Sequence, residues 1–479
     1  MTALPRNGPV RVNDLHSGLN ETVVSEVVAV RTRTDLVHAV ERARASGRHV
    51  AVCGGRHAMG GQQFGTGAVL LDTRTFDRVH AFDPGAGTIE ADAGIQWPAL
   101  VAWLARAQAG AARQWSIRQK QTGADRLSLG GSLAANVHGR GLDLPPFAAD
   151  VEDFTLVGAD GAVRRCSRVE NRRLFGLAIG GYGLFGVIDR VRLRLAPRTK
   201  LRRVVEIATA DEAVPALEAR AAAGFAYGDF QFAIDPASPD FLRLGVLSCY
   251  QPVAGDTPIP ERQAALSEDD WRRLLVLAHT DKSEAFRRYA EFYLGTSGQI
   301  YWSDLAQMSF YSDQYHRGVD LALGHRGSEM ITEIYVPRAR LADFMAEAAA
   351  DFRAHGTDVV YGTVRLIRRD AETFLPWARE DWACVIFNLH VEHADAAIAR
   401  AAGAFRRLID AAVRRGGSYY LTYHRWATRE QVLACHPGFV DFLRAKRAHD
   451  PDGTFQSDWH RHYAAMFRSE LARAEPRAA

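Results

Sequence analysis

The stretch CGGRHAMGGQQFGTG, residues 53–67, places six glycines around a single histidine, His57. Short apolar runs flank it, HVAVC at 49–53 and AVLLD at 68–72, and the sequence before them predicts a strand followed by a helix. Glycines in such a turn let another group approach the backbone closely. Because no serine, carboxylate or cysteine pair accompanies His57, the stretch predicts a binding loop in a domain of mixed helices and strands.

Two further segments have the same character: LSLGGSLAANVHGRG at 127–141 and LFGLAIGGYGLFGVI at 174–188. The second contains GxGxxG, but a dinucleotide fingerprint must open a helix. Here Val191, Leu193 and Leu195 alternate with arginines, which predicts a strand. Three separate glycine-rich turns favour a large cofactor held mainly by main-chain N–H groups, not a Rossmann site.

Composition sets the broad class. The chain has 479 residues, 47% of them apolar, which is enough for two or three domains with sizeable cores. A net charge of +3 with arginines and acids interleaved argues against nucleic-acid binding. Five widely spaced cysteines predict free thiols and a cytoplasmic protein. We find no signal peptide or membrane anchor in the pattern.

Several motifs together resemble one family. GGRHAMGG, AVLLDT, GADRLSLGGSLAANVHGRG, DVEDFTLVGADGAVRRC and LFGLAIGGYGLFGVIDRVRLRL resemble, in this order, the FAD-binding domain of the PCMH-type flavoproteins, the vanillyl-alcohol oxidase superfamily. Later segments, including TEIYVPR, WACVIF and GGSYYLTYHRW, resemble the branch of the decaprenylphosphoryl-ribose oxidases and, more distantly, the alditol oxidases. No single motif would be sufficient, but their joint occurrence is specific.

The resemblance implies an α+β fold in which a two-part FAD-binding domain carries an inserted α+β cap. We expect the FAD-binding domain at 1–200, the substrate-binding cap at 201–417, and a segment at 418–479 that returns to the FAD domain and the active site. The polar link APRTKLRR at 196–203 and the pair Gly416–Gly417 mark these boundaries.

FAD is the implied cofactor. In the alditol oxidase branch, a histidine at the position of His57 is bonded to the flavin 8α carbon, whereas the decaprenylphosphoryl-ribose enzymes lack it. We therefore expect a covalent flavin on His57; the alternative is a histidine that only hydrogen-bonds within the turn. The other implied cofactor contacts are Gly54, Gly55, Arg56, Ala58, Met59, Gly60, Gly61, Gly123, Ser128, Leu129, Gly130, Gly131, Ala135, Asn136, His138, Val187 and Tyr420. For His138 a purely loop-fixing role is an equal alternative.

The resemblance also implies catalytic positions. Arg365 and Glu333 fall where relatives carry a cation and a substrate-facing Gln or Glu, but Tyr423 replaces a lysine. A tyrosine relays a proton without bringing a fixed positive charge. Either the substrate differs from a furanose or alditol, or proton handling has moved to His424 or Arg365. Thr363 replaces an acid of the alditol branch, which argues against polyol binding.

Three weaker features remain. Asn388 and His390 share one face of a predicted strand, so Asn388 either lines the pocket or belongs to an ordinary polar face. The pairs His390/His393 and His460/His462 have no third ligand at a recognisable spacing, and we predict no metal site. The aromatic segment 300–316 is either a lid over an apolar or lipid-linked substrate or, as we favour, ordinary packing.

The predicted function is FAD-dependent oxidation of a CH–OH group in a small-molecule alcohol such as a carbohydrate, with oxygen or another acceptor reoxidising the flavin. One alternative is a flavin-dependent reductase of a carbon–carbon double bond, like the sterol Δ24-reductase relatives. Another is a flavin-binding or flavin-free protein that has lost its chemistry, for which the tyrosine at 423 is the only support.

Overall fold

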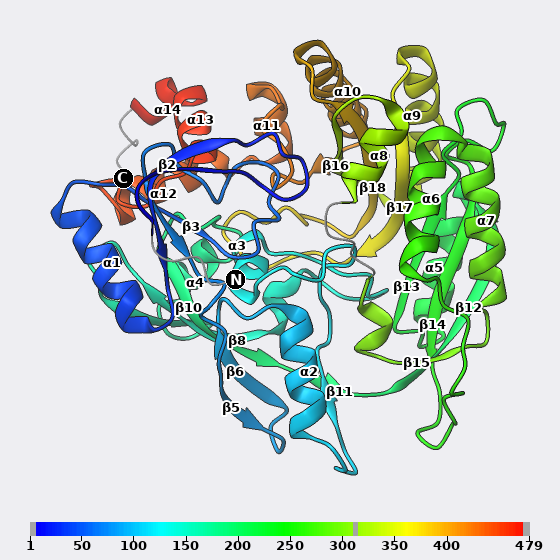
Figure 1. The fold of residues 1–479 in the computed structure, drawn as a ribbon, viewed down its shortest axis with the longest axis horizontal. Coiled ribbons are helices and arrows are strands. Elements are labelled where there is room, and N and C mark those ends of the chain that lie inside the picture. The colour runs from blue at the N-terminus through cyan, green and yellow to red at the C-terminus, as the bar shows by residue number, and fades with distance from the viewer. Residues whose placement is uncertain (1–5, 310–314, 473–479) are drawn as a thin grey trace, which may run out of the picture.

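The computed structural model describes residues 6–309 and 315–472. In Figure 1 the N-terminal sheets and the C-terminal helices lie side by side, and the cap with its large sheet forms the other half of the molecule. The expected α+β class is confirmed. None of the helices in the described part of the chain is long and apolar enough to cross a bilayer.

Two small sheets, with a two-stranded pair of β7 and β11, build the N-terminal part. The first has the order β1-β2-β4-β3, and the second has the order β5-β6-β10-β8-β9. Helix α1 follows β2 and packs on β4, because Leu36, Ala39, Val40 and Ala43 form one buried face. The bounds are β1 (Arg6–Val12), β2 (Thr22–Ala29), α1 (Arg33–Ala45), β3 (Val50–Cys53), β4 (Val69–Asp72), β5 (Val79–Asp83), β6 (Thr88–Asp92), α2 (Trp97–Ala107), β7 (Trp115–Ser116), α3 (Leu129–Ala135), β8 (Val151–Val157), β9 (Val163–Ser167), α4 (Arg172–Ala178), β10 (Val187–Arg194) and β11 (Ala196–Pro197).

The glycine-rich run at 174–188 behaves as its sequence predicts. β10 begins at Val187, directly after Gly186, and pairs antiparallel with both β6 and β8. Gly186 has a φ of 143°, and a Cβ there would lie 2.7 Å from the carbonyl oxygen of Val157. The GxGxxG pattern therefore ends in a central strand, not in a helix.

The cap is built on one eight-stranded sheet of order β15-β12-β14-β13-β17-β18-β16-β19, whose neighbouring strands are antiparallel. Its elements are β12 (Lys200–Thr209), α5 (Ala210–Ala222), β13 (Tyr227–Phe232), β14 (Leu244–Pro252), α6 (Glu268–Thr280), α7 (Lys282–Gly295), β15 (Ile300–Trp302), α8 (His316–Leu323), β16 (Gly327–Pro337), α9 (Leu341–His355), β17 (Val359–Ile367), β18 (Trp382–Glu392), α10 (Asp395–Val413) and β19 (Ser418–Tyr419).

The two faces of this sheet have different partners. On β18, the ring of Phe387 contacts Phe352 of α9 at a centroid distance of 5.2 Å, while the next residue, Asn388, lines a cavity. Helices α5, α9 and α10 cover the Phe387 face, and α6, α7 and α8 pack together on the cavity side. Alternation along β18 thus separates the core of the cap from the wall of the cavity.

The end of the described chain returns to the beginning. β19 pairs with β16 of the cap, and Phe455 forms a parallel bridge with Val50 of β3. The helices of this part are α11 (Arg429–Cys435), α12 (Phe439–His449), α13 (Asp458–Met466) and α14 (Arg468–Ala472). The large sheet thus begins at Lys200 and ends at Tyr419, near the predicted boundaries, while the domain limits themselves stay a prediction.

Replacing Phe387 by alanine tests the cap core. This ring is fully buried between Phe232, Phe344 and Phe352, so we expect Phe387→Ala to lower the free energy of unfolding by about 3–5 kcal/mol. Val169→Ala, at a side chain that is 94% exposed, is the control and should change stability by less than about 0.5 kcal/mol. Denaturant titration measures both, and equal midpoints would contradict this packing.

Candidate active site

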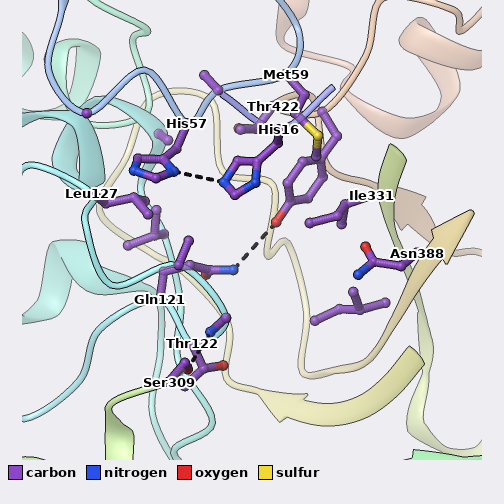
Figure 2. Close-up of a pocket in the computed structure, with 18 of the residues that line it drawn as sticks. His16, His57, Met59, Gln121, Thr122, Leu127, Ser309, Ile331, Asn388 and Thr422 are labelled. Carbon is purple, nitrogen blue, oxygen red and sulfur yellow. Dashed lines mark hydrogen bonds between the residues drawn. The ribbon is translucent and has the colours of Figure 1, made fainter. Parts of the chain in front are cut away.

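One cavity of about 760 Å³ lies where the N-terminal part, the cap and the C-terminal return meet. Cavities of this size hold large organic ligands. Figure 2 shows His57, His16 and Leu127 on one side of the open space and Ile331 and Asn388 on the other. The cavity therefore has one wall made by the glycine-rich loops and another made by the sheet of the cap.

The glycine-rich loops are pressed together so closely that side chains are excluded. A Cβ on Gly54 would lie 2.0 Å from Ser128 Oγ, and one on Gly55 would lie 2.2 Å from the carbonyl oxygen of Arg126. Ser128 Oγ in turn accepts the N–H of Gly131 and caps α3. The loops at 53–61 and 123–131 thus present main chain to the cavity, as the sequence predicts.

Most of the predicted cofactor contacts line this cavity. They are Gly54, Gly55, Arg56, His57, Ala58, Met59, Gly123, Ser128, Gly130, Gly131, Ala135, Val187 and Tyr420. Gly60, Gly61, Leu129, Asn136 and His138 lie behind the lining. Gly60 donates its N–H to the carbonyl of Thr422, and the Asn136 amide donates to Asp370, so these residues fix the loops in place.

His57 faces the cavity next to a second histidine. His57 Nδ1 lies 2.8 Å from His16 Nε2, so one ring donates to the other (Figure 2). Burial, reinforced by the neighbouring His16, lowers the pKa of His57 to about 3. His57 is therefore a neutral imidazole at physiological pH.

Glu333 of β16 is fully buried and collects donors from three parts of the chain. Its Oε1 accepts the Tyr423 hydroxyl at 2.8 Å, and its Oε2 accepts the Tyr335 hydroxyl at 2.9 Å and His138 Nε2 at 2.8 Å. His138 Nδ1 lies 3.0 Å from the carbonyl oxygen of Gly139, so both ring nitrogens face oxygen acceptors. His138 and Glu333 thus form a buried, fully hydrogen-bonded ion pair.

This arrangement sets the protonation states of the site. Burial alone would raise the pKa of Glu333, but His138, the Tyr423 hydroxyl and Arg365 outweigh it and lower that pKa. Burial and the adjacent Glu333 carboxylate raise the pKa of Tyr423 well above its ordinary value. The pair is therefore a neutral phenol at the cavity wall, hydrogen-bonded to an ionised carboxylate behind it.

Arg365 and Asn388 complete the polar side of the wall. Arg365 on β17 is 4% exposed, and its Nε and Nη1 atoms make no hydrogen bond to any residue that the structure describes. The same holds for Asn388 Oδ1, whose side chain points into the open space in Figure 2. Buried polar groups without partners cost free energy, so both are placed to bind a ligand.

The structure does not bring His424 to the cavity, which corrects the expectation that it handles the substrate proton. Its ring is stacked on Phe405 at 4.6 Å and on Trp426 at 5.5 Å, and burial lowers its pKa to about 3. Residues 420–424 form an irregular turn, in which Tyr423 faces the cavity and His424 faces the aromatic stack.

Several lining residues were not found in the sequence. Gln121 approaches the Tyr423 hydroxyl at 3.5 Å, and Thr122, Leu127, Gln62 and Tyr182 also line the cavity. Gln62, Leu127 and Tyr182 lie inside the glycine-rich segments, and Gln121 and Thr122 directly precede the motif that begins at Gly123. This position was the only signal that could have indicated them. The aromatic segment 300–316 contributes to the lining through Tyr301, Leu305, Ala306, Met308, Ser309 and Tyr315. The predicted alternatives for this segment, a lid or ordinary packing, also involve residues 310–314, which lie outside the described residues.

The comparisons identify the family. A family model described as an FAD binding domain matches residues 24–167, which contain the first two glycine-rich loops. The chain is also similar, at 22% identity over 93% of its length and 95% of the relative's, to decaprenylphosphoryl-β-D-ribose oxidase of Mycolicibacterium smegmatis. The chain therefore contains an FAD-binding domain and is similar to oxidoreductases of the PCMH type. The expected family resemblance is thereby confirmed.

Other relatives match only a part. The chain is 35% identical to the oxidoreductase ORF5 of the fasciation locus of Rhodococcoides fascians, over 35% of the chain and 37% of the relative. It is 31% identical to cytokinin dehydrogenase 5 of Oryza sativa subsp. japonica, over 32% of the chain and 29% of the relative. The chain thus matches about a third of the length of these two proteins.

The residues present fit FAD. The glycine-rich loops approach so closely that a Cβ at Gly54 would overlap a neighbouring loop. The loops carrying Gly54, Gly130 and Gly183 all line one cavity, which is large enough for FAD. Main-chain N–H groups of such loops suit the pyrophosphate, and the unpartnered guanidinium of Arg365 suits an electron-rich group.

Gly54→Ala tests this cradle. The added Cβ would overlap Ser128 Oγ and separate the two loops, so we expect a folded protein whose FAD content after purification falls at least several-fold. The ratio of absorbance at 450 nm to that at 280 nm measures it. Gly438→Ala, where a Cβ meets nothing within 4 Å, is the control. Equal flavin in both variants would show that the cofactor lies elsewhere.

Proposed function

We propose that this oxidoreductase oxidises a CH–OH group of a small, sugar-like or other alcohol, and that Tyr423 and Glu333 accept the hydroxyl proton. One observation carries the proposal: a neutral phenol at the cavity wall donates to a fully buried carboxylate. When bound, FAD supplies the hydride acceptor, and oxygen or another acceptor restores it.

The proton has a short path. A substrate hydroxyl donates to the phenol oxygen of Tyr423 as the phenol passes its own proton to Glu333 Oε1, 2.8 Å away. Tyr423 stays neutral because its pKa is raised, and Glu333 is ionised, with its oxygens free of a proton, because its pKa is lowered. The tyrosine therefore replaces the expected lysine as a relay, with the carboxylate as the base.

The positive charge that Tyr423 lacks comes from two other groups. Arg365 faces the cavity with unpartnered N–H groups and stabilises negative charge that develops on an oxygen there. His138 lies behind Glu333 and lowers its pKa, which keeps the carboxyl ionised until it takes the proton. Asn388 orients a substrate hydroxyl from the same sheet.

The cap wall supports a substrate with an apolar body. Helices α6 and α7 turn Trp271, Leu275, Phe286, Tyr289 and Phe292 toward the cavity. Thr363, in place of a carboxylate, makes simple polyols poor substrates. The full-length relative is named for a ribose derivative, which supports a sugar-like alcohol.

The proposal also includes a covalent bond between His57 and the flavin, and a cytoplasmic location. The neutral His57 ring faces the cavity, and its imidazole would hold the flavin through a bond to the 8α carbon. All five cysteines are buried free thiols, which supports a reducing, cytoplasmic environment.

Tyr423→Phe tests the relay. Removing the hydroxyl breaks the path to Glu333 without changing the size of the ring, so we expect kcat to fall about 10²–10⁴-fold while FAD stays bound. Stopped-flow absorbance at 450 nm, with alcohols of differing apolar substituents as substrates, measures the reductive step. Tyr419→Phe, a buried tyrosine outside the cavity lining, is the matched control.

The pH dependence of kcat tests the same mechanism independently. Because the pKa of Glu333 is lowered, the acid limb of kcat should lie below the ordinary value of 4.5 in the native enzyme. His138→Gln removes the cation that lowers it, so the limb should move to higher pH. Unchanged rates in Tyr423→Phe, or flavin reduction by NADPH but by no alcohol, would overturn the proposal.

Acid precipitation tests the tether. We expect yellow flavin in the protein pellet of the native enzyme and in the supernatant of His57→Ala, because only a covalent bond survives denaturation. His38→Ala, on the exposed side of α1, is the control and should keep its flavin in the pellet. Flavin found wholly in the supernatant of the native enzyme would exclude attachment at His57.

A further inference from the structure

A cluster of histidines surrounds a second buried carboxylate, Glu329, at the start of β16. Glu329 is paired in register with His390 of β18, and α6 brings His279 against it from the cavity side. The side chains of His279, Glu329 and His390 are 1%, 4% and 7% exposed. Three elements far apart in the sequence thus converge on one carboxylate.

The ring nitrogens of this cluster converge on the carboxylate of Glu329. His279 Nδ1 lies 2.8 Å from the carbonyl oxygen of Leu275, and His279 Nε2 lies 2.9 Å from Glu329 Oε1. His390 Nδ1 lies 3.5 Å from the same oxygen, which is too long for a good hydrogen bond. Neither His390 Nδ1 nor Glu329 Oε2 makes a hydrogen bond among the described residues.

Glu333, four residues along the same strand, shows the contrast. Its oxygens accept from two tyrosine hydroxyls and His138. Glu329 has imidazole nitrogens as neighbours and no hydroxyl donor among the described residues. Several imidazole nitrogens that converge on one buried carboxylate offer a ligand set for a cation.

The spacing suits a metal ion. With metal–ligand bonds of about 2.0–2.2 Å, two ligand atoms of a tetrahedral site lie roughly 3.3 Å apart. The ligand atoms of His279, Glu329 and His390 lie within 4.8 Å of one another, and the two imidazole rings are perpendicular. His316 Nδ1 approaches the other carboxylate oxygen at 3.2 Å and occupies the side of a fourth ligand.

The outer contacts also match those of metal sites. A histidine ligand commonly donates its second N–H to a backbone carbonyl or a neighbouring polar group, which fixes the ring. His279 does so through Leu275, and His390 Nε2 lies 2.9 Å from His325 Nε2. The rings are therefore held in place before any ion arrives.

We propose that His279 Nε2, the Glu329 carboxylate and His390 Nδ1 bind one divalent transition-metal ion of the zinc class. Two imidazoles and a carboxylate are ligands that such ions prefer. The ion fastens α6 to β16 and β18, and α6 carries Trp271, Leu274 and Leu275 of the cavity wall. The sequence predicts no metal site, because these three ligands are too far apart in the chain to form a motif.

The first test is metal content. Protein produced without a histidine tag in zinc-supplemented medium should retain about one zinc ion per chain after dialysis. Inductively coupled plasma mass spectrometry measures the zinc content. His279→Ala, Glu329→Gln and His390→Ala should each lower this content at least tenfold. His436→Ala removes an equally buried imidazole outside the cluster and should retain the metal. Native protein without stoichiometric zinc, or variants that keep it, would overturn the proposal.

A second measurement covers variants that fail to fold. Native holoenzyme is stripped with a chelator and titrated with Co²⁺ alone, which should give absorption bands between about 550 and 650 nm, outside the flavin band, if the site is tetrahedral. Zn²⁺ added afterwards should abolish these bands and raise the melting temperature by mass action. Absence of the bands, together with an unchanged melting temperature, would show that the cluster binds no metal.

Discussion

The ion pair between His138 and Glu333 is the interaction on which the rest of the site depends. A buried carboxylate cannot be left without compensation, and here the compensating groups come from an N-terminal loop, the cap and the C-terminal return. Satisfying Glu333 therefore fixes how the three parts of the chain meet. The same contact determines which proton acceptor lies behind Tyr423.

The cavity-facing side of β16 and β18 carries the polar residues of the site. Alternation places Glu329, Ile331 and Glu333 of β16 on one side, with Asn388 and His390 of β18 opposite them. The middle of this face is open to the cavity, and its two ends are occupied by buried carboxylates. Glu333 at one end is paired with two tyrosine hydroxyls and His138, whereas Glu329 at the other end has imidazole neighbours.

The sequence predicted what depends on neighbouring residues. Gly54, Gly55 and the loop at 127–141 were recognisable because a close backbone approach demands glycine locally, and the strand after Gly186 followed from its alternation. The partnership of His138 with Glu333 was not predictable, because 195 residues separate them and no period connects the two elements.

The orientation of side chains within irregular segments could not be predicted from the sequence either. Tyr423 and His424 are adjacent in a turn, where neither helical nor strand periodicity says which side chain faces the ligand. Packing decided it, since the imidazole joins an aromatic cluster with Phe405 and Trp426. Gln121 had no motif to mark it, and the cluster around Glu329 required the register of β16 and β18.

The return of the chain through β19 has a consequence for how the enzyme is made. A growing chain completes its glycine-rich loops and its whole cap before Tyr423 is synthesised, and the bridge between Val50 and Phe455 closes later still. Contacts of such long sequence separation form late in folding. An unfinished chain therefore lacks Tyr420, Thr422 and Tyr423, so the wall of the cavity closes only once the molecule is whole.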